Sequence, residues 1–316
     1  MNWRYKALAQ WAFSILPGGE SLNYLAQVYL TGSLPIRAEG LTGGGTAIAR
    51  AHLDAIGRVL RRPLADLRFY EFGAGWHFST PLLYWCLGVE KQILIDLRPL
   101  ARANVINHTI AAIQESAEAL QLERIPAHYL TQRALRSELM TYYCIDYRAP
   151  CDARDTGLLT GSIDCITSTS TLEHIARPDL DKILSECARI LAPDGVASMV
   201  IDYKDHYSYF DCSISEQNFR RYSERHWSLY NPPLHYQNRL RHRDYVDAAR
   251  RAGFVVVEEH TVEGSDEGLG ATLNGRLSEE FRACEVRDLT VRESHLVLKK
   301  SPSNCHPAER DAELDG

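Results

Sequence analysis

Between residues 67 and 203, short apolar runs alternate with helical patterns, and this alternation constrains the fold more than any other feature of the chain. Apolar runs joined by helical crossovers indicate parallel strands that are covered by helices on both faces. The sequence therefore predicts a doubly wound α/β domain. The predicted strands are 68–73, 92–97, 142–147, 162–168 and 196–203, and the predicted helices between them are 78–87, 99–121 and 178–191.

The segments that flank this region extend the domain. Residues 1–62 carry three helical patterns separated by glycine-rich breakers, and we expect them to form an N-terminal helical cap or lid. Residues 63–300 are expected to form the main domain, with the aromatic and polar stretch 204–241 as an insertion. Residues 301–316 hold four acidic residues and one basic residue, so we expect a disordered tail. The further predicted elements are helices 3–16, 20–30, 46–61 and 242–252, strands 254–260 and 289–298, and a turn at Pro193-Asp194-Gly195.

Composition excludes several classes of protein. With 316 residues, 45% hydrophobic and 24% charged, the chain is neither collagen-like nor wholly disordered. A net charge of −6 argues against a nucleic-acid partner, because affinity for phosphate backbones depends on clustered Lys and Arg. No stretch approaches the roughly 20 apolar residues of a membrane span. Peripheral membrane contact through helix 3–16 stays open, although covering a neighbouring domain is the commoner use of such a helix. The oligomeric state is not predicted.

The eight cysteines form no CxxC pair and no zinc-ligand spacing. Several of them fall in apolar stretches that are expected to be buried. In a chain of this length, we therefore expect reduced thiols and a cytoplasmic protein, with no metal bound by cysteine.

A glycine-containing turn follows the first predicted strand, in the pattern E-x-G-x-G of Glu71, Gly73 and Gly75. Glycine lets the backbone approach a ligand closely, and the next helix directs its N-terminus at the same point. Asp96 ends the second predicted strand, 21 residues after Gly75, where a carboxylate can accept hydrogen bonds from both ribose hydroxyls. Together these residues predict a nucleoside-binding edge.

Two further segments lie at carboxyl ends of predicted strands, where open α/β sheets bind ligands. Asp152 and Ala153 follow the third strand, 12 residues before Asp164 opens the fourth. The fourth strand leads into Ser168-Thr169-Ser170-Thr171-Leu172-Glu173-His174-Ile175.

The set E-x-G-x-G, Asp after strand two, D-A followed by S-I-D, L-E-H-I and R-I-L-A-P-D-G resembles the class I S-adenosylmethionine-dependent methyltransferases. The resemblance covers about residues 67–203 and extends to about 299. It implies a seven-stranded, mostly parallel sheet with an antiparallel seventh strand inserted beside the sixth. His77 stands where the family often has a third glycine, so this loop departs from the family's pattern.

The resemblance also implies S-adenosylmethionine as cofactor, with S-adenosylhomocysteine as product, and it assigns residues to parts of the cofactor. Glu71, Gly73, Ala74 and Gly75 are expected near its amino-acid part. Asp96 and Leu97 are expected near the ribose. The remaining implied cofactor contacts are Asp152 and Ala153 at the adenine edge and Ser168 and Thr169 near the sulfonium.

Histidines in the loops after strands four and five are candidate general bases, because imidazole takes up protons near neutral pH. His206 and His174 are both candidates, and Asp205 could orient the imidazole of His206. Asp202 and Asp205 raise the possibility of a metal, as in catechol-type enzymes, but without a third ligand we expect none.

Polar and aromatic residues of the 204–241 insertion are candidate substrate contacts, since they offer apolar walls with polar tips. The alternative is an aromatic mini-core that holds the N-terminal helices onto the sheet. The candidates are Tyr207, Trp227, Tyr230, His235, Tyr236, Asn238 and Arg239.

We therefore expect a methyltransferase that acts on an oxygen, or less favourably a nitrogen, of a small metabolite or a glycan or natural-product precursor. Two alternatives stay open. One is a SAM-binding regulatory module without catalysis, and the other is a nucleotide-dependent oxidoreductase.

Overall fold

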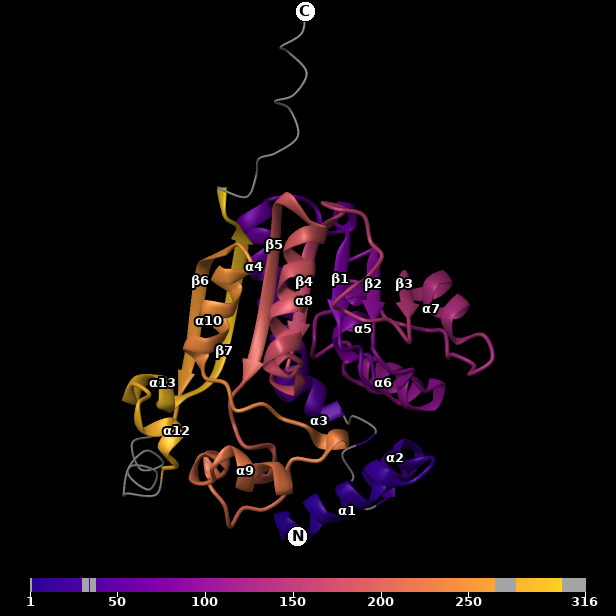
Figure 1. Ribbon diagram of the computed structural model, residues 1–316. Helices are drawn as coiled ribbons and strands as arrows, with labels where there is room; N and C mark the ends of the chain where they lie inside the picture. Colours follow the sequence, from indigo (N-terminus) through magenta and orange to yellow (C-terminus); the bar gives the residue numbers. More distant parts are fainter. Residues whose placement is uncertain (1, 30–33, 35–37, 265–276, 303–316) are drawn as a thin grey trace, which may run out of the picture.

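The computed structural model describes residues 2–29, 34, 38–264 and 277–302, so most of the predicted tail lies outside the described residues. Seven strands form one sheet in the order β3-β2-β1-β4-β5-β7-β6 (Figure 1). Strands β1 to β5 are parallel, and β7 is antiparallel to both β5 and β6. The predicted fold class is thus confirmed. The strands are β1 (Phe69–Phe72), β2 (Gln92–Ile95), β3 (Ile145–Arg148), β4 (Ile163–Thr169), β5 (Leu191–Asp202), β6 (Phe254–Glu263) and β7 (Val291–Lys300).

Helices cover both faces of the sheet and one of its ends (Figure 1). The α-helices are α1 (Trp3–Ile15), α2 (Gly19–Tyr29), α3 (Ala38–Gly40), α4 (Thr46–Leu60), α5 (Ser79–Cys86), α6 (Ala103–Ser116), α7 (Leu135–Tyr143), α8 (Arg177–Ile190), α9 (Glu224–Trp227), α10 (His242–Arg251), α12 (Glu279–Arg282) and α13 (Val286–Thr290). Short turns of other helix types are η1 (Leu41–Gly45), η2 (Leu64–Asp66), η3 (Leu172–His174), η4 (His206–Tyr209), η5 (Asn218–Arg221), η6 (Ser228–Tyr230) and η7 (Pro233–His235).

Each face of the sheet has its own apolar core, because successive residues of a strand point to opposite faces. Phe69 belongs to a core built with α4, α5 and α6. Its neighbour Tyr70 belongs to the other core, built with α8 and α10. Both faces of the parallel strands are therefore buried, as the continuous apolar runs predicted.

A third apolar cluster joins the N-terminus to the insertion, and we call it the aromatic mini-core. Its buried members are Trp3, Ala7, Tyr207, Phe219, Trp227, Phe281 and Leu289. The backbone N–H of Trp3 also donates to the Asp211 carboxylate at 2.9 Å. In Figure 1, α1, α2 and α9 lie below the sheet, at the end towards which β5 runs. Helices α1 and α2 therefore cover the carboxyl edge of the sheet, whereas α4 packs on one face.

Two local predictions differ from the structure. The strand predicted at 142–147 begins only at Ile145, because α7 extends to Tyr143 and buries Leu135, Leu139 and Tyr143 at helical spacing. The turn predicted at Pro193-Asp194-Gly195 lies within β5, where the pairing with β4 shifts register between Ile163 and Cys165. A Cβ on Gly195 would lie 2.9 Å from the carbonyl oxygen of Asp164, so the close approach at this irregularity requires glycine.

In the described part of the chain, no helix is long and apolar enough to cross a membrane. The seven cysteines in that part are all free thiols, and Cys86, Cys165 and Cys187 are buried.

Candidate cofactor and acceptor site

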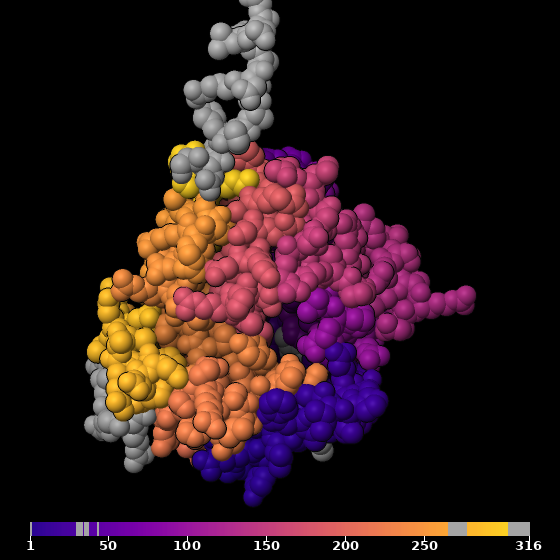
Figure 2. Space-filling model, in the orientation of Figure 1, coloured from indigo at the N-terminus to yellow at the C-terminus, as the bar shows by residue number. Residues whose placement is uncertain are grey.

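A cavity of about 590 Å³ opens at the carboxyl edge of the sheet. Its walls come from the ends of β1 and β2, the segment 151–154, the η3 loop and α8, and its cover comes from α1 and the insertion. Figure 2 shows the surface hollowed between the indigo N-terminal helices, the orange insertion and the purple and magenta segments of the sheet. The cavity lies where open α/β sheets bind their ligands.

Gly73 forms part of the cavity wall in a conformation that only glycine tolerates there. Its φ is +81°, and a Cβ at this position would lie 2.4 Å from the side chain of Thr171. The backbone N–H of Gly73 donates to Ile95 at 3.0 Å, which ties the loop to the end of β2. The glycine that the sequence motif singled out is therefore required for close packing between the β1 and β4 loops.

Asp96 is buried at the end of β2 and lines the cavity. Its carboxylate accepts backbone N–H bonds from Gly75 and Arg98, both at 3.0 Å. Burial raises the pKa of Asp96, and these two hydrogen bonds and the Arg98 charge oppose that shift. The two N–H groups fix the orientation of the carboxylate, whose remaining lone pairs are available to hydroxyl groups.

Asp152 and Ala153 also line the cavity, as predicted for the adenine end. Arg154 pairs with Asp152 at 2.6 Å and with Asp179 at 2.7 Å, and all three side chains border the cavity. The hydrogen bonds and charge of Arg154 lower the pKa of Asp152. This end of the cavity therefore carries an ionised, half-exposed network.

Five of the other residues predicted for the cofactor do not line the cavity, namely Glu71, Ala74, Gly75, Ser168 and Thr169. Ala74 and Gly75 lie on the turn beyond Gly73. The buried Glu71 carboxylate accepts a hydrogen bond from Thr167 at 2.8 Å, and burial raises its pKa to about 7. Thr169 contacts His52 of α4 at 3.3 Å. Ser168 is fully buried, and Leu97, by contrast, does line the cavity.

The candidate bases lie together beyond the β4 and β5 ends. The rings of His174 and His206 are 4.9 Å apart between centroids, and His174 lines the cavity. The Nδ1 atom of His174 is 2.8 Å from the carbonyl oxygen of Tyr236. Burial, together with the nearby His206, lowers the pKa of His174 to about 4. Its imidazole is therefore neutral at physiological pH.

The acid beside His206 is Asp202, not the predicted Asp205. Oδ2 of Asp202 is 3.4 Å from Nε2 of His206. The Asp205 carboxylate instead accepts hydrogen bonds from the backbone N–H of Tyr207 and the side chain of Asn218, both at 2.9 Å. The reason is local, because Asp205 caps the N-terminus of η4 and so points away from the imidazole of the next residue.

Comparison with known protein families identifies the domain. Residues 71–199 match the family model described as "Methyltransferase domain". The chain carries a class I S-adenosylmethionine-dependent methyltransferase domain. Among curated proteins, no sequence matches the chain.

Solved structures resemble the methyltransferase only distantly. Geranyl diphosphate C-methyltransferase from Streptomyces coelicolor A3(2) is 14% identical, with 81% of this chain and 79% of that chain covered and a TM-score of 0.46. A protein assigned as a sarcosine dimethylglycine methyltransferase, from Galdieria sulphuraria, is 19% identical over 81% and 85%, with a TM-score of 0.44. The [4+2]-cyclase SpnF is 14% identical over 80% and 81%, with a TM-score of 0.44. At this level of similarity, none of the three bears on the activity of this chain.

The cavity of the methyltransferase fits the family's cofactor. Its volume lies within the usual range of small-molecule sites. The oriented carboxylate of Asp96 suits ribose hydroxyls, and Ala153 offers an apolar wall beside Asp152. The residues that would hold the adenosyl group are therefore in one place.

The predicted substrate contacts of the methyltransferase separate into two groups. Tyr236 lines the cavity. Tyr207, Trp227 and Tyr230 pack in or against the aromatic mini-core with Trp3, which favours the structural alternative for these three.

The polar candidates are held by other protein groups. The Asn238 side chain donates to the carbonyl oxygens of Leu172 and Ile175 and accepts from the hydroxyl of Tyr245. Arg239 pairs with Glu224 and Glu280, both at 2.6 Å. His235 lies against Tyr207, with ring centroids 4.9 Å apart. Asn238 and Arg239 are thus committed to positioning the insertion.

Residues that the sequence did not single out also build the cavity. Trp11 of α1 lines it, and its indole N–H donates to the carbonyl oxygen of Leu229 at 2.9 Å. Ser228, Asn231 and Pro233 complete this cover. No local motif marks these positions, because they reach the cavity only through packing between segments more than 200 residues apart.

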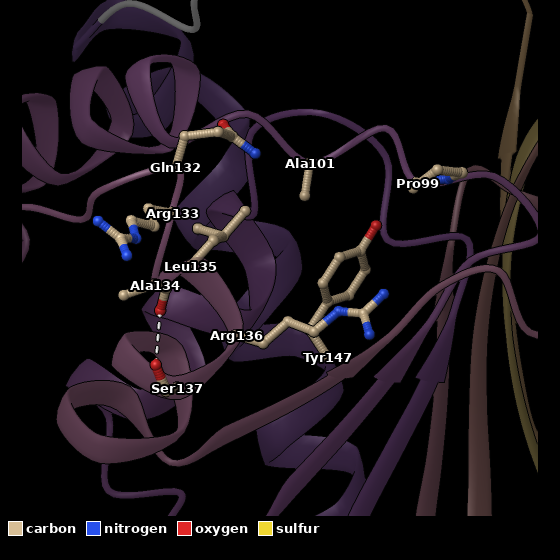
Figure 3. A pocket seen from close by; sticks show the side chains of 9 residues that line it. All are labelled: Pro99, Ala101, Gln132, Arg133, Ala134, Leu135, Arg136, Ser137 and Tyr147. Carbon is tan, nitrogen blue, oxygen red and sulfur yellow. Dashed lines mark hydrogen bonds between the residues drawn. The ribbon is translucent and has the colours of Figure 1, made fainter.

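A second cavity, of about 430 Å³, lies beside β3 and α7 (Figure 3). Polar side chains that line it hydrogen-bond to the protein backbone. Gln132 accepts the backbone N–H of Ala103 at 2.9 Å, and Arg136 donates to the carbonyl oxygen of Ala149. Ser137 donates to the carbonyl oxygen of Ala134 at 2.9 Å, the bond dashed in Figure 3. Because none of the motif residues lines this cavity, we do not assign it to the cofactor.

Proposed function

We propose that the protein methylates an oxygen atom of a small molecule bound in the 590 Å³ cavity, with a nitrogen acceptor as the less favoured case. One observation carries the proposal. Gly73, Asp96 and Asp152, expected at the cofactor, line the same cavity as His174 and Tyr236, expected at the acceptor. Cofactor and acceptor would therefore meet within one cavity.

The cover over the cavity supports a small acceptor. Trp11 and the segment around Pro233 close the side that faces away from the sheet, and the hydrogen bond from Trp11 to Leu229 joins them. Enclosed sites of this size bury most of the surface of a small ligand. A metabolite or a natural-product or glycan precursor fits this space better than a folded macromolecule.

The histidines support an oxygen acceptor. The contact of His174 Nδ1 with the Tyr236 carbonyl requires the proton on Nδ1, which leaves a lone pair on Nε2. A neutral imidazole can accept the hydrogen bond of an acceptor hydroxyl, and proton removal by such a group contributes about 10²–10⁴-fold. His206, beside Asp202, is the other candidate base.

S-adenosylmethionine, when bound, supplies an electrophilic methyl carbon. The work left to this chain is alignment, which contributes on the order of 7 kcal/mol or more in favourable cases. Asp96 and Gly73 would fix the adenosyl group, while Tyr236 and His174 would place the acceptor.

The test is methyl transfer from labelled S-adenosylmethionine to a library of small hydroxy and amino compounds, with wild-type protein and His206→Ala. We expect labelled product with a hydroxy compound. We also expect slower turnover of His206→Ala, with S-adenosylhomocysteine affinity nearly unchanged. Tight S-adenosylhomocysteine binding without any product would favour the regulatory module. Tight NAD(P)H binding without S-adenosylhomocysteine binding would favour the oxidoreductase.

A further inference from the structure

Three side chains with metal-ligand chemistry converge beyond the ends of β4 and β5. Glu173 and His174 come from η3, and His206 begins η4. One ligand atom from each lies within 4.8 Å of the other two. Two imidazole nitrogens and one carboxylate oxygen form the donor set of many catalytic metal sites.

The Glu173 carboxylate is buried without a hydrogen-bond partner. The residue is 1% exposed, and neither carboxylate oxygen has a partner within the described residues. Nε2 of His206 is also buried, and within the described residues its contact is the Asp202 carboxylate at 3.4 Å. Buried polar groups almost always have partners, because leaving one unpaired costs free energy. The Glu173 carboxylate therefore offers unused lone pairs beside the two imidazoles.

Neighbouring groups hold the cluster in place from outside. The contact between His174 Nδ1 and the Tyr236 carbonyl, at 2.8 Å, leaves Nε2 of His174 as the free donor atom. The backbone carbonyl of Glu173 accepts the N–H of Asn238 at 2.7 Å, which fixes the η3 loop. Metal-binding histidines are oriented through their other ring nitrogen, as His174 is by the Tyr236 carbonyl. Oδ2 of Asp202 lies 3.4 Å from Nε2 of His206, so this nitrogen binds an ion only if it turns away from Asp202.

We propose that Glu173, His174 and His206 bind a divalent transition-metal ion such as Zn²⁺ at the acceptor end of the cavity. Imidazole donors suit Zn²⁺ and its neighbours in the first transition row, whereas Mg²⁺ and Ca²⁺ prefer oxygen ligands. Tetrahedral Zn²⁺ needs donor atoms roughly 3.3 Å apart. Since the three ligand atoms lie within 4.8 Å of one another, ion binding requires them to approach by about 1.5 Å at most.

The position gives the metal a role in the proposed reaction. Because His174 lines the cavity, a coordination site left open there would face the acceptor. An acceptor oxygen bound to the ion would lose its proton more readily, as metal-bound water does. The pair Asp202 and Asp205, which the sequence analysis considered for a metal and set aside, is not the donor set; Glu173 replaces them. The metal proposal does not rest on methyl transfer, since binding is measured without it.

The experiment titrates chelator-treated full-length protein with Zn²⁺ by calorimetry and with Co²⁺ by absorption spectroscopy. We expect one ion per chain. We expect Glu173→Gln and His206→Ala to weaken binding by at least about 100-fold. The matched control His108→Ala, an exposed histidine of α6, should keep wild-type affinity. Glu173→Gln preserves shape, so it remains informative even where His206→Ala folds poorly.

The proposal is overturned if no ion binds, or if both variants bind as tightly as wild-type protein. It is also overturned if the cobalt spectrum shows sulfur-to-metal charge transfer, which would place the ion on cysteines. S-adenosylhomocysteine titration of the same samples separates the two proposals. Retained cofactor binding with no metal binding rejects only the metal site, and the converse rejects only the cofactor assignment.

Discussion

The carboxyl edge of the sheet has two halves, which differ in how their buried polar groups are satisfied. At the β1–β3 half, Asp96 accepts two backbone N–H bonds, and Asp152 pairs with Arg154. At the β4–β5 half, the Glu173 carboxylate is buried and has no hydrogen-bond partner in the described part of the chain. The first half holds its carboxylates with backbone N–H groups and Arg154, whereas the second half leaves the Glu173 carboxylate unpaired among the described residues.

Residues of neighbouring loops are enough to position the polar groups of the β1–β3 half. The β4–β5 half also needs segments from distant parts of the chain. Asp96 is oriented by its own loop and by Gly75, both at short range in the fold. The β4–β5 half depends on the insertion and on α1, which reach it through the aromatic mini-core. Four changes test this division, from the largest expected effect to the smallest.

Trp227→Ala tests whether the insertion is a structural support. Trp227 is 1% exposed and packs against Trp3, Tyr207 and Phe219. Removing a buried indole should lower the free energy of unfolding by about 3–5 kcal/mol. Denaturant unfolding measures this change. Near-normal stability with a raised acceptor KM would instead place Trp227 in the acceptor site.

Glu71→Gln tests whether burial raises the pKa of the Glu71 carboxyl group. Burial raises the pKa of Glu71 from 4.5 to about 7, so the fold favours its protonated form. The stabilisation from protonated Glu71 is fully present below about pH 4.5. As the pH rises from there through 7, the free energy of unfolding falls by roughly 3 kcal/mol. Wild-type protein should therefore lose stability relative to Glu71→Gln between pH 4.5 and 7. Parallel stability curves across that range would contradict the assignment.

Asp96→Ala tests the cofactor half. Loss of two hydrogen bonds from ribose hydroxyls to a charged group should weaken S-adenosylhomocysteine binding by about 1.5–3 kcal/mol, or tenfold to more than a hundredfold. Asp247→Ala, an exposed carboxylate of α10, is the matched control and should bind normally. Equal affinity of both folded variants would remove Asp96 from the ribose site.

Tyr236→Phe tests the acceptor half with the mildest change. Tyr236 is among the residues that border the cavity, and its backbone carbonyl, which orients His174, is retained in the variant. Loss of one hydroxyl contact should raise the acceptor KM by about tenfold or less, with S-adenosylhomocysteine affinity unchanged. A fall in S-adenosylhomocysteine affinity would instead indicate that Tyr236 contacts the cofactor.

The fold was largely predictable from the sequence, because parallel strands and their crossover helices leave a local signature. Two exceptions are the turn predicted at Pro193-Asp194-Gly195, which lies within β5, and α7. For α7 the cause lies in the sequence pattern. Its buried face, with Leu135, Leu139 and Tyr143, was obscured where the helix runs directly into the apolar strand beginning at Ile145.

The site was predictable where spacing alone fixes position, as for Gly73, Asp96 and Asp152. It was not predictable where distant segments meet. Trp11 reaches the cavity through α1, and Tyr207 and Trp227 pack on Trp3 and do not line the cavity. Nor could the sequence indicate that Asp205 would cap η4 and leave Asp202 beside His206. Such contacts depend on tertiary packing, which carries no local pattern.

The central claim is that the carboxyl edge binds an adenosyl cofactor across β1 and β2. Calorimetric titration of the full-length protein with S-adenosylhomocysteine tests it most directly. We predict saturable binding of one molecule per chain. Absence of binding by folded protein would contradict the account.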